Sequence, residues 1–251
     1  NPSSVYNFAQ KSKMAIEDAR EIIADSIGAA KSNEIYFTGG GSESDNWALK
    51  SAAFGLRDKG NHIITTKIEH HAILNTCAYL EKNGFEITYL DVDSEGFVSL
   101  EDVENAITEK TILISVMFAN NEIGTIEPVC EIGEIAHKHG ILFHTDAVQA
   151  MCHVPINVTE MNIDLLSASA HKFHGPKGVG FMYMKNTAKL EPFIHGGAQE
   201  RARRAGTSNV PGIVGMGKAV KLALDTLDKD THTIINMRNY IVNRILGEIP
   251  D

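Results

Sequence analysis

Residues 167–180 read SASAHKFHGPKGVG, and they place one lysine, Lys172, between two histidines and ahead of a Gly-Pro-Lys-Gly turn. Short apolar runs bounded by turn residues predict a buried strand over Asp164–Ala170 and another over Val179–Met184. Lys172 is therefore expected at the carboxyl end of a strand, where open α/β sheets bind their ligands. Desolvation and cationic neighbours lower the pKa of an amine, so this position suits a Schiff-base nucleophile. The ordinary alternative is a solvated loop lysine.

The composition narrows the class of protein. The chain has 251 residues, is 43% hydrophobic and carries a formal net charge of −9. This length can bury a sizeable core, either as one large α/β domain or as one domain plus part of another. It contains no apolar run long enough to span a bilayer and no basic stripe, so neither a membrane nor a nucleic acid is expected as a partner.

The cysteines and histidines do not form a recognisable metal motif. The three cysteines lack CxxC pairing, and no signal peptide precedes them, so a reducing cytoplasmic setting is expected. The eleven histidines include close pairs, but their spacing fits no standard zinc pattern. We therefore predict no metal site.

A glycine-rich turn near the N-terminus favours anion binding. After a helical stripe over Tyr6–Ile27, a strand is predicted over Glu34–Thr38, and it runs into the sequence GGGSES at residues 39–44. A second amphipathic helix follows, and a strand–glycine–helix junction brings backbone amides and the positive end of a helix to an anion. Ser42 and Ser44 could cap this helix or donate hydrogen bonds to a phosphate. The spacing is neither GxGxxG nor GxxxxGK[ST], which disfavours a dinucleotide site or P-loop.

The middle of the chain alternates short apolar strands with helices, which predicts a mostly parallel sheet covered by helices on both faces. A long helical region, Val210–Gly247, is expected to be interrupted near Asp228–Asp230, where we place a domain boundary. The strands are predicted at His62–Thr66, Glu86–Leu90, Thr111–Phe118 and Ile141–His144, and the helices at residues 72–82, Ser99–Ile107 and Val129–His139.

Polar residues follow several of these strands and are expected to converge on one crevice. An anion cradle, a lysine, a carboxylate, an imidazole and amide side chains together suit pyridoxal phosphate (PLP), which needs an aldehyde-binding lysine and an acid beside its pyridine nitrogen. Asp146 suits the nitrogen and His70 the ring, while Asn121 and Gln149 suit the 3-oxygen. Each has a plainer alternative, such as a helix cap, a structural histidine or a loop hydrogen bond.

At this point the sequence resembles the cysteine desulfurases of the NifS/IscS type, in the class-V branch of fold-type-I PLP enzymes. The resemblance covers nearly the whole chain and implies the large domain of a PLP-dependent transferase, an α/β fold with a mostly parallel seven-stranded sheet between helices. The matching stretches, in order, are Phe37–Lys50, Glu69–Cys77, Ala119–Pro128, His144–Ala150, Ser167–Gly180 and His195–Asn209.

The resemblance also implies a role for each matching residue. Lys172 would hold PLP covalently and exchange protons at the substrate's α-carbon, and His70 would stack on the ring and assist. Asp146 would pair with the pyridine nitrogen. Thr207 would reach the phosphate of the other subunit in a homodimer. The remaining cofactor ligands would be Gly41, Ser42, Ser169 and His171 at the phosphate, and Asn121 and Gln149 at the 3-oxygen.

The sequence departs from the family pattern in two ways. Ala198, Ala202 and His71 replace a glycine, a glycine and a lysine that are usual there, which looks tolerable. More important, the family's persulfide-forming cysteine and carboxylate-binding arginine belong to a C-terminal domain that this chain does not reach. We therefore expect a chain truncated at both ends, with a PLP-binding large domain at residues 1–227 and the start of a small domain at 228–251.

The resemblance implies that the parent protein converts L-cysteine into L-alanine and an enzyme-bound persulfide, with the sulfur passed to an iron–sulfur scaffold or another acceptor protein. A selenocysteine lyase, or another class-V lyase or transaminase, is the alternative within the class. A catalytically inactive PLP-binding dimerisation domain is the alternative for the chain as it stands. Cys77, Cys130 and Cys152 do not align with the family's nucleophile.

Overall fold

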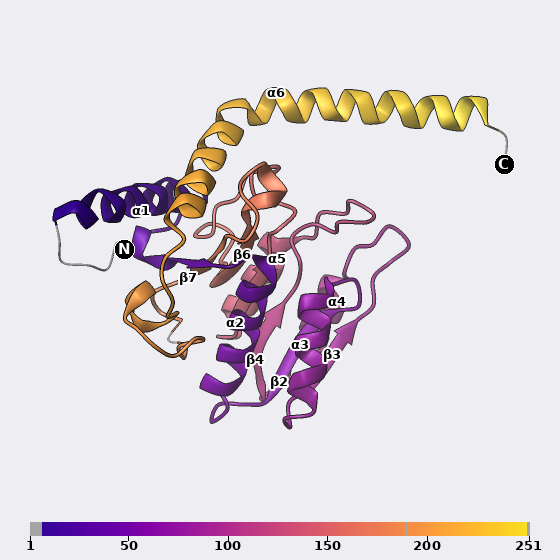
Figure 1. The fold of residues 1–251 in the computed structure, drawn as a ribbon. Helices are drawn as coiled ribbons and strands as arrows, with labels where there is room; N and C mark the ends of the chain where they lie inside the picture. The colour runs from indigo at the N-terminus through magenta and orange to yellow at the C-terminus, as the bar shows by residue number, and fades with distance from the viewer. Residues whose placement is uncertain (1–6, 189, 250–251) are drawn as a thin grey trace.

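A single seven-stranded sheet organises the computed structural model, which describes residues 7–188 and 190–249 (Figure 1). The strand order across the sheet is β1-β7-β6-β5-β4-β2-β3. The strands are β1 (Ile35–Thr38), β2 (His62–Thr66), β3 (Glu86–Leu90), β4 (Thr111–Ser115), β5 (Leu142–Asp146), β6 (Leu165–Ser169) and β7 (Gly180–Met184).

The helices occupy the segments that hydrophobic periodicity predicts. The predicted first helix begins at Tyr6, which lies outside the described residues. The helices are α1 (Asn7–Ser26), α2 (Gly41–Gly55), α3 (His71–Glu81), α4 (Leu100–Asn105), α5 (Val129–Lys138) and α6 (Val210–Glu248), with short 3-10 turns at η1 (Ser32–Glu34), η2 (Ala170–Phe173) and η3 (Gln199–Ala202). None of the helices in the described part of the chain is long and apolar enough to cross a membrane.

The predicted interruption of the last helix is wrong. α6 continues through Asp228–Asp230 without a break, although Figure 1 shows that it bends along its length. This segment contains neither glycine nor proline, and Thr226 Oγ1 donates a 2.6 Å hydrogen bond to Asp230 Oδ2 one turn later. A charged cluster on an exposed helix therefore does not by itself end the helix.

The sheet is mostly parallel, as expected. β2 pairs in parallel with β3 and β4, and β4, β5 and β6 continue the parallel order. β7 is the exception, because it runs antiparallel to both β6 and β1. The carboxyl ends of β4, β5 and β6 consequently lie along one edge of the sheet.

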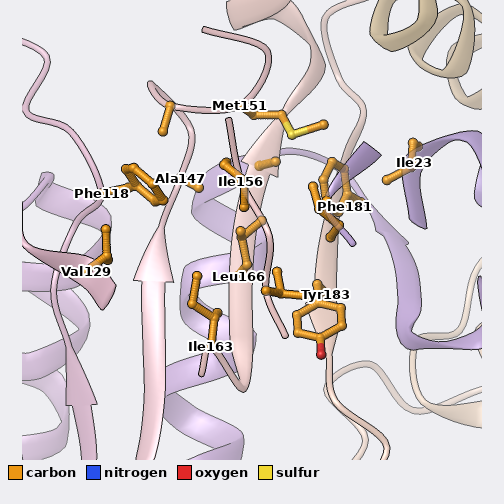
Figure 2. Close-up of a cluster of buried hydrophobic side chains, with 14 of the residues drawn as sticks. Ile23, Phe118, Val129, Ala147, Met151, Ile156, Ile163, Leu166, Phe181 and Tyr183 are labelled. Carbon is orange, nitrogen blue, oxygen red and sulfur yellow. The ribbon is translucent and has the colours of Figure 1, made fainter. Parts of the chain in front are cut away.

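Two hydrophobic cores, one on each face, hold the helices against the sheet. One core joins side chains of α1, α4, α5 and α6 to the sheet, and the other joins side chains of α2 and α3 to it. In the first core Leu166 of β6 gathers with Phe181 and Tyr183 of β7, and Ile23 of α1 lies beyond them (Figure 2). These two layers leave the edge with the strand ends as the place for a polar site.

A close backbone contact joins the β1–α2 turn to β7. A Cβ atom added at Gly180 would lie 2.7 Å from the Cα of Gly40 and 2.4 Å from the carbonyl oxygen of Ala168. Real Cβ atoms do not approach backbone this closely, so Gly180 is the residue that allows the glycine-rich turn to pack on the sheet.

We predict that Gly180→Ala destabilises the chain, because the added methyl group meets backbone that has no room to move. Overpacking of this kind costs about 1–3 kcal/mol of unfolding free energy, measurable by urea denaturation. Gly247→Ala is the matched control, since no described atom lies within 4 Å of the added Cβ. An equal loss in both variants would contradict this account of the contact.

Candidate functional site

A cavity of about 310 Å³ lies at the carboxyl ends of β4, β5 and β6, beside the N-terminus of α2. Its volume is in the range of small-molecule sites. Nine of the ten residues predicted to bind or act on a cofactor line it, and Thr207 is the exception. The predicted residues in the lining are Gly41, Ser42, His70, Asn121, Asp146, Gln149, Ser169, His171 and Lys172, and four others complete it, namely Asp45, Met117, Ala119 and Val148.

The glycine-rich turn forms an open cradle at one end of the cavity. Gly40 precedes α2 with a φ of 147°, a conformation that favours glycine, and makes no side-chain capping hydrogen bond. A Cβ at Gly41 would lie 2.6 Å from Cγ2 of Val148, so only glycine fits there without movement of Val148. The first turn of α2 therefore offers backbone amides and the positive end of a helix to an anion.

Two polar side chains after β6 face the same cradle. The Oγ atom of Ser169 lies 2.9 Å from Nδ1 of His171, which fixes both groups relative to the end of the strand. Ser169 also lies near the turn, since a Cβ at Gly40 would be 3.5 Å from its Oγ. Hydroxyl and imidazole groups beside a helix N-terminus form a donor set suited to a phosphate.

Asp146 supplies a buried carboxylate at the cavity wall. It is the last residue of β5 and is 5% exposed. Its Oδ1 accepts a 2.9 Å hydrogen bond from the amide of Val148 in the turn after β5, and the alternative of a helix cap is not realised, because β6 is the next element. Burial raises the pKa of Asp146, while the Val148 amide, His70 and Lys172 act in the opposite direction. Lys172 and His70 therefore both favour the charged form of this carboxylate.

Lys172 and His70 are both exposed residues of the cavity lining. Lys172 lies in η2, immediately beyond β6, which confirms its predicted place at a strand end. The expected desolvation of its amine is not found in this chain. His70 caps α3, because its Nδ1 accepts a 3.1 Å hydrogen bond from the amide of Ala72. In its neutral form the ring therefore carries its proton on Nε2.

The remaining predicted residues differ in position. Asn121 and Gln149 line the cavity, and the amide of Asn121 also donates a 2.8 Å hydrogen bond to Glu122. Thr207 is exposed and lies outside the cavity lining of its own chain. Its segment is held by Arg204, whose guanidinium forms two hydrogen bonds with the Glu43 carboxylate in the first turn of α2.

Behind Asp146 lies a group of buried acids that sequence reasoning missed. Asp45 lines the cavity and is 1% exposed, and atoms of Asp45, His70 and Asp146 all lie within 4.8 Å of one another. At an effective dielectric constant of about 20, two unit charges at that separation repel by about 3.5 kcal/mol. Burial raises the pKa of Asp45 well above its usual value, and the negative charge of Asp146 raises it further.

Glu69 and His144 complete this buried group. One oxygen of Glu69 accepts hydrogen bonds from the amide of Met117 at 2.7 Å and from Thr66 at 2.9 Å, which ties together the loops after β2 and β4. Burial raises the pKa of Glu69 to about 8. Burial also lowers the pKa of His144 to about 3, so its imidazole is neutral at ordinary pH.

The one sequence signal for Asp45 was its spacing. Residues four apart lie on the same face of a helix, so Asp45 follows Gly41 on the face that meets the cavity. A polar residue in an amphipathic helix is ordinarily expected to face solvent, so hydrophobic periodicity does not point to Asp45.

The three cysteines lie elsewhere. Cys77 and Cys152 are buried, and burial raises the pKa of each thiol to about 12. Cys130 is exposed on α5. None of them lines the cavity.

Comparison with known proteins identifies a family and relatives that match this chain. The model of the class-V aminotransferase family matches residues 1–248. The cysteine desulfurase IscS of Clostridium botulinum is 59% identical over all 251 residues, and that of Methanosarcina thermophila is 59% identical over 246 residues. The chain spans 63% of the length of the first relative and 61% of the second.

Solved structures agree with the sequence relatives. A NifS-like protein superposes with a TM-score of 0.95 at 42% identity, covering 98% of this chain and 68% of its own. A structure described as SspA in complex with cysteine has a TM-score of 0.85 at 49% identity, and the match covers 88% of this chain and 64% of that one. With a family match over almost every residue, and with the fold and cavity expected from it, this chain belongs to the class-V aminotransferases, a family of PLP-dependent enzymes.

Proposed function

We propose that the protein containing this chain is a PLP-dependent cysteine desulfurase, and that the cavity holds the cofactor. In the proposed reaction L-cysteine and an enzyme thiol give L-alanine and an enzyme persulfide, so that the substrate C–S bond breaks and an S–S bond forms. The observation that carries the proposal is the convergence of Lys172, Asp146 and the α2 anion cradle in one cavity. The similarity to IscS proteins and to a structure described with cysteine supports the choice of substrate.

The residues present fit PLP. The uncapped first turn of α2, with Ser42, Ser169 and His171, would hold the phosphate. The carboxylate of Asp146 would accept a hydrogen bond from the protonated ring nitrogen. Asn121 and Gln149 would approach the 3-oxygen, and Lys172 would bind the aldehyde carbon.

When bound, PLP supplies an electron sink that stabilises negative charge developing on the substrate. The chain supplies the groups that bind and move protons. The Nζ of Lys172, free of the cofactor once substrate is bound, would exchange a proton with the substrate's α-carbon. His70 would lie against the ring and carry its exchangeable proton on Nε2, because its Nδ1 is held by the Ala72 amide.

The persulfide would form on a cysteine outside this chain. The two buried thiols are strongly protonated, and none of Cys77, Cys130 and Cys152 faces the cavity. The named relatives do not favour a selenocysteine lyase, another class-V lyase or transaminase, or an inactive dimerisation domain. We further propose a cytoplasmic homodimer that passes sulfur to an iron–sulfur scaffold or another acceptor.

We predict that the chain incubated with PLP gains a visible absorption band, and that borohydride reduction followed by peptide mass mapping finds the pyridoxyl group on Lys172. Lys172→Ala should lose both the band and the modified peptide, because it removes the only amine expected to react in the cavity. Lys110→Ala is the control, as this exposed lysine pairs with Glu86 instead. Labelling of Lys172→Ala to the wild-type extent would contradict the assignment. A desulfurase assay on the full-length parent then tests the reaction.

We predict that Thr207 completes the phosphate site of the partner subunit. Thr207→Ala should weaken PLP binding roughly tenfold to hundredfold, the usual effect of losing a hydrogen bond to a charged group, while Thr207→Ser should retain it. Affinity is measured by absorbance titration of the dimer.

A mixed dimer separates action across the interface from action within one subunit. Pairing a Thr207→Ala subunit with a Lys172→Ala subunit leaves one intact site if Thr207 crosses the interface, so half of the sites should bind with wild-type affinity. If Thr207 serves its own subunit, no site in the mixed dimer is intact, and tight binding is not recovered.

A further inference from the structure

We propose that Asp45 stays protonated in the folded protein, so that of the two neighbouring aspartates in the cavity lining Asp146 alone is a carboxylate anion. The proposed function supplies the reason why Asp146 has to be charged, because a carboxylate there stabilises a protonated ring nitrogen. The protonation of Asp45 itself is a property of this chain and can be measured without cofactor.

The position of Asp45 leaves it no hydrogen bond at one oxygen. It lies in α2, one turn after Gly41, and is 1% exposed. Among the described residues no partner hydrogen bonds to its buried Oδ1. A buried carboxylate oxygen without a donor is strongly disfavoured as an anion, whereas a neutral carboxyl group needs no compensating charge.

His144 is the nearest base, and it does not supply that charge. Its Nε2 lies 3.8 Å from the unpaired oxygen of Asp45, too far for a hydrogen bond. Both ring nitrogens already meet hydroxyl groups, with Ser115 Oγ at 2.9 Å and Ser167 Oγ at 3.0 Å. Full burial keeps this imidazole neutral. An ion pair between His144 and Asp45 is therefore not the expected state.

The neighbouring groups affect the pKa values of Asp45 and Asp146 differently. Asp146 on β5 and Glu69 after β2 are acids, and each adds to the effect of burial in raising the pKa of Asp45, while a hydrogen bond with the Ser167 side chain acts in the opposite direction. His70 and Lys172 act on Asp146 and lower its pKa, and the amide of Val148 donates to it. Of two acids too close to ionise together, Asp146 has the Val148 amide as a donor and Lys172 nearby, while Asp45 has a buried oxygen without a donor, so the proton resides on Asp45.

Infrared spectroscopy of the cofactor-free chain at neutral pH locates this proton, because a protonated carboxyl group and a carboxylate absorb at different frequencies. The wild type minus Asp45→Asn difference spectrum should contain a protonated-carboxyl band. The wild type minus Asp146→Asn difference should contain a carboxylate band instead. The negative charge of Asp146 contributes to the raised pKa of Glu69, so both differences are also recorded in a Glu69→Gln background, where Glu69 has no carboxyl band. The reverse assignment, or a carboxylate band lost in Asp45→Asn, would overturn the proposal.

Cofactor affinity gives a second, independent measurement. Asparagine matches a protonated aspartate in shape and charge, so Asp45→Asn should bind PLP within about threefold of wild type and leave the pH profile of the visible band unchanged. Asp146→Asn removes the proposed anion and should weaken binding at least about tenfold. Equal weakening in the two variants would show that Asp45 acts as an anion, and would contradict the proposal.

The two measurements distinguish failure of this inference from failure of the proposed function. If wild type binds no PLP while the infrared assignment holds, the proposed function fails and the protonation of Asp45 stands. If Asp45→Asn does not fold, Asp45→Ser removes the same carboxyl group and supplies the difference spectrum instead. A carboxylate band lost in that variant would overturn the proposal.

Discussion

The close approach of Gly40 to Gly180 is the contact on which the site depends. β7 runs antiparallel between β1 and β6, so the turn that leaves β1 is pressed against the strand beside the end of β6. The N-terminus of α2 and the Ser169–His171 pair are thereby brought to one cradle, with Lys172 one residue further on. The proposed anion site and the proposed cofactor-binding amine of Lys172 are thus two results of the same strand arrangement.

The second constraint is the desolvation of carboxyl groups at the sheet edge, which determines which of them are charged. The sheet edge buries Asp45, Glu69 and Asp146, and the buried histidine beside Asp45 is neutral. A protein tolerates such a group when protons or cations keep its net charge low. A cationic ring nitrogen entering the cavity would meet a carboxylate that already lacks solvent, which makes the interaction stronger than it would be in water. The carboxylate of Asp146 is desolvated when the chain folds, so that part of the free-energy cost is not incurred when a ligand binds.

Most of the fold could be predicted because runs of apolar residues mark the segments that are buried in the core. The strands His62–Thr66 and Glu86–Leu90 have the predicted bounds. The next strand was predicted to extend to Phe118 but ends at Ser115. Val116, Met117 and Phe118 are buried all the same, because Val116 and Phe118 belong to the first hydrophobic core and Met117 lines the cavity. Hydrophobicity therefore located the buried segment correctly but could not tell a paired strand from buried irregular backbone, and for a related reason it did not reveal that β7 runs antiparallel.

Some residues of the candidate site could also be predicted from the sequence, and others could not. Residues in loops directly after strands could be predicted, because chain direction alone brings the ends of parallel strands together. Asp45 could not, because the side of α2 that meets the cavity depends on how the helix packs on β6, and hydrophobic periodicity assigns a lone acid to the solvent face. Its four-residue spacing from Gly41 indicates a position facing the cavity only once Gly41 is known to line that cavity. A polar residue one turn after a glycine at such a helix N-terminus can therefore face the same cavity as the glycine, as Asp45 does.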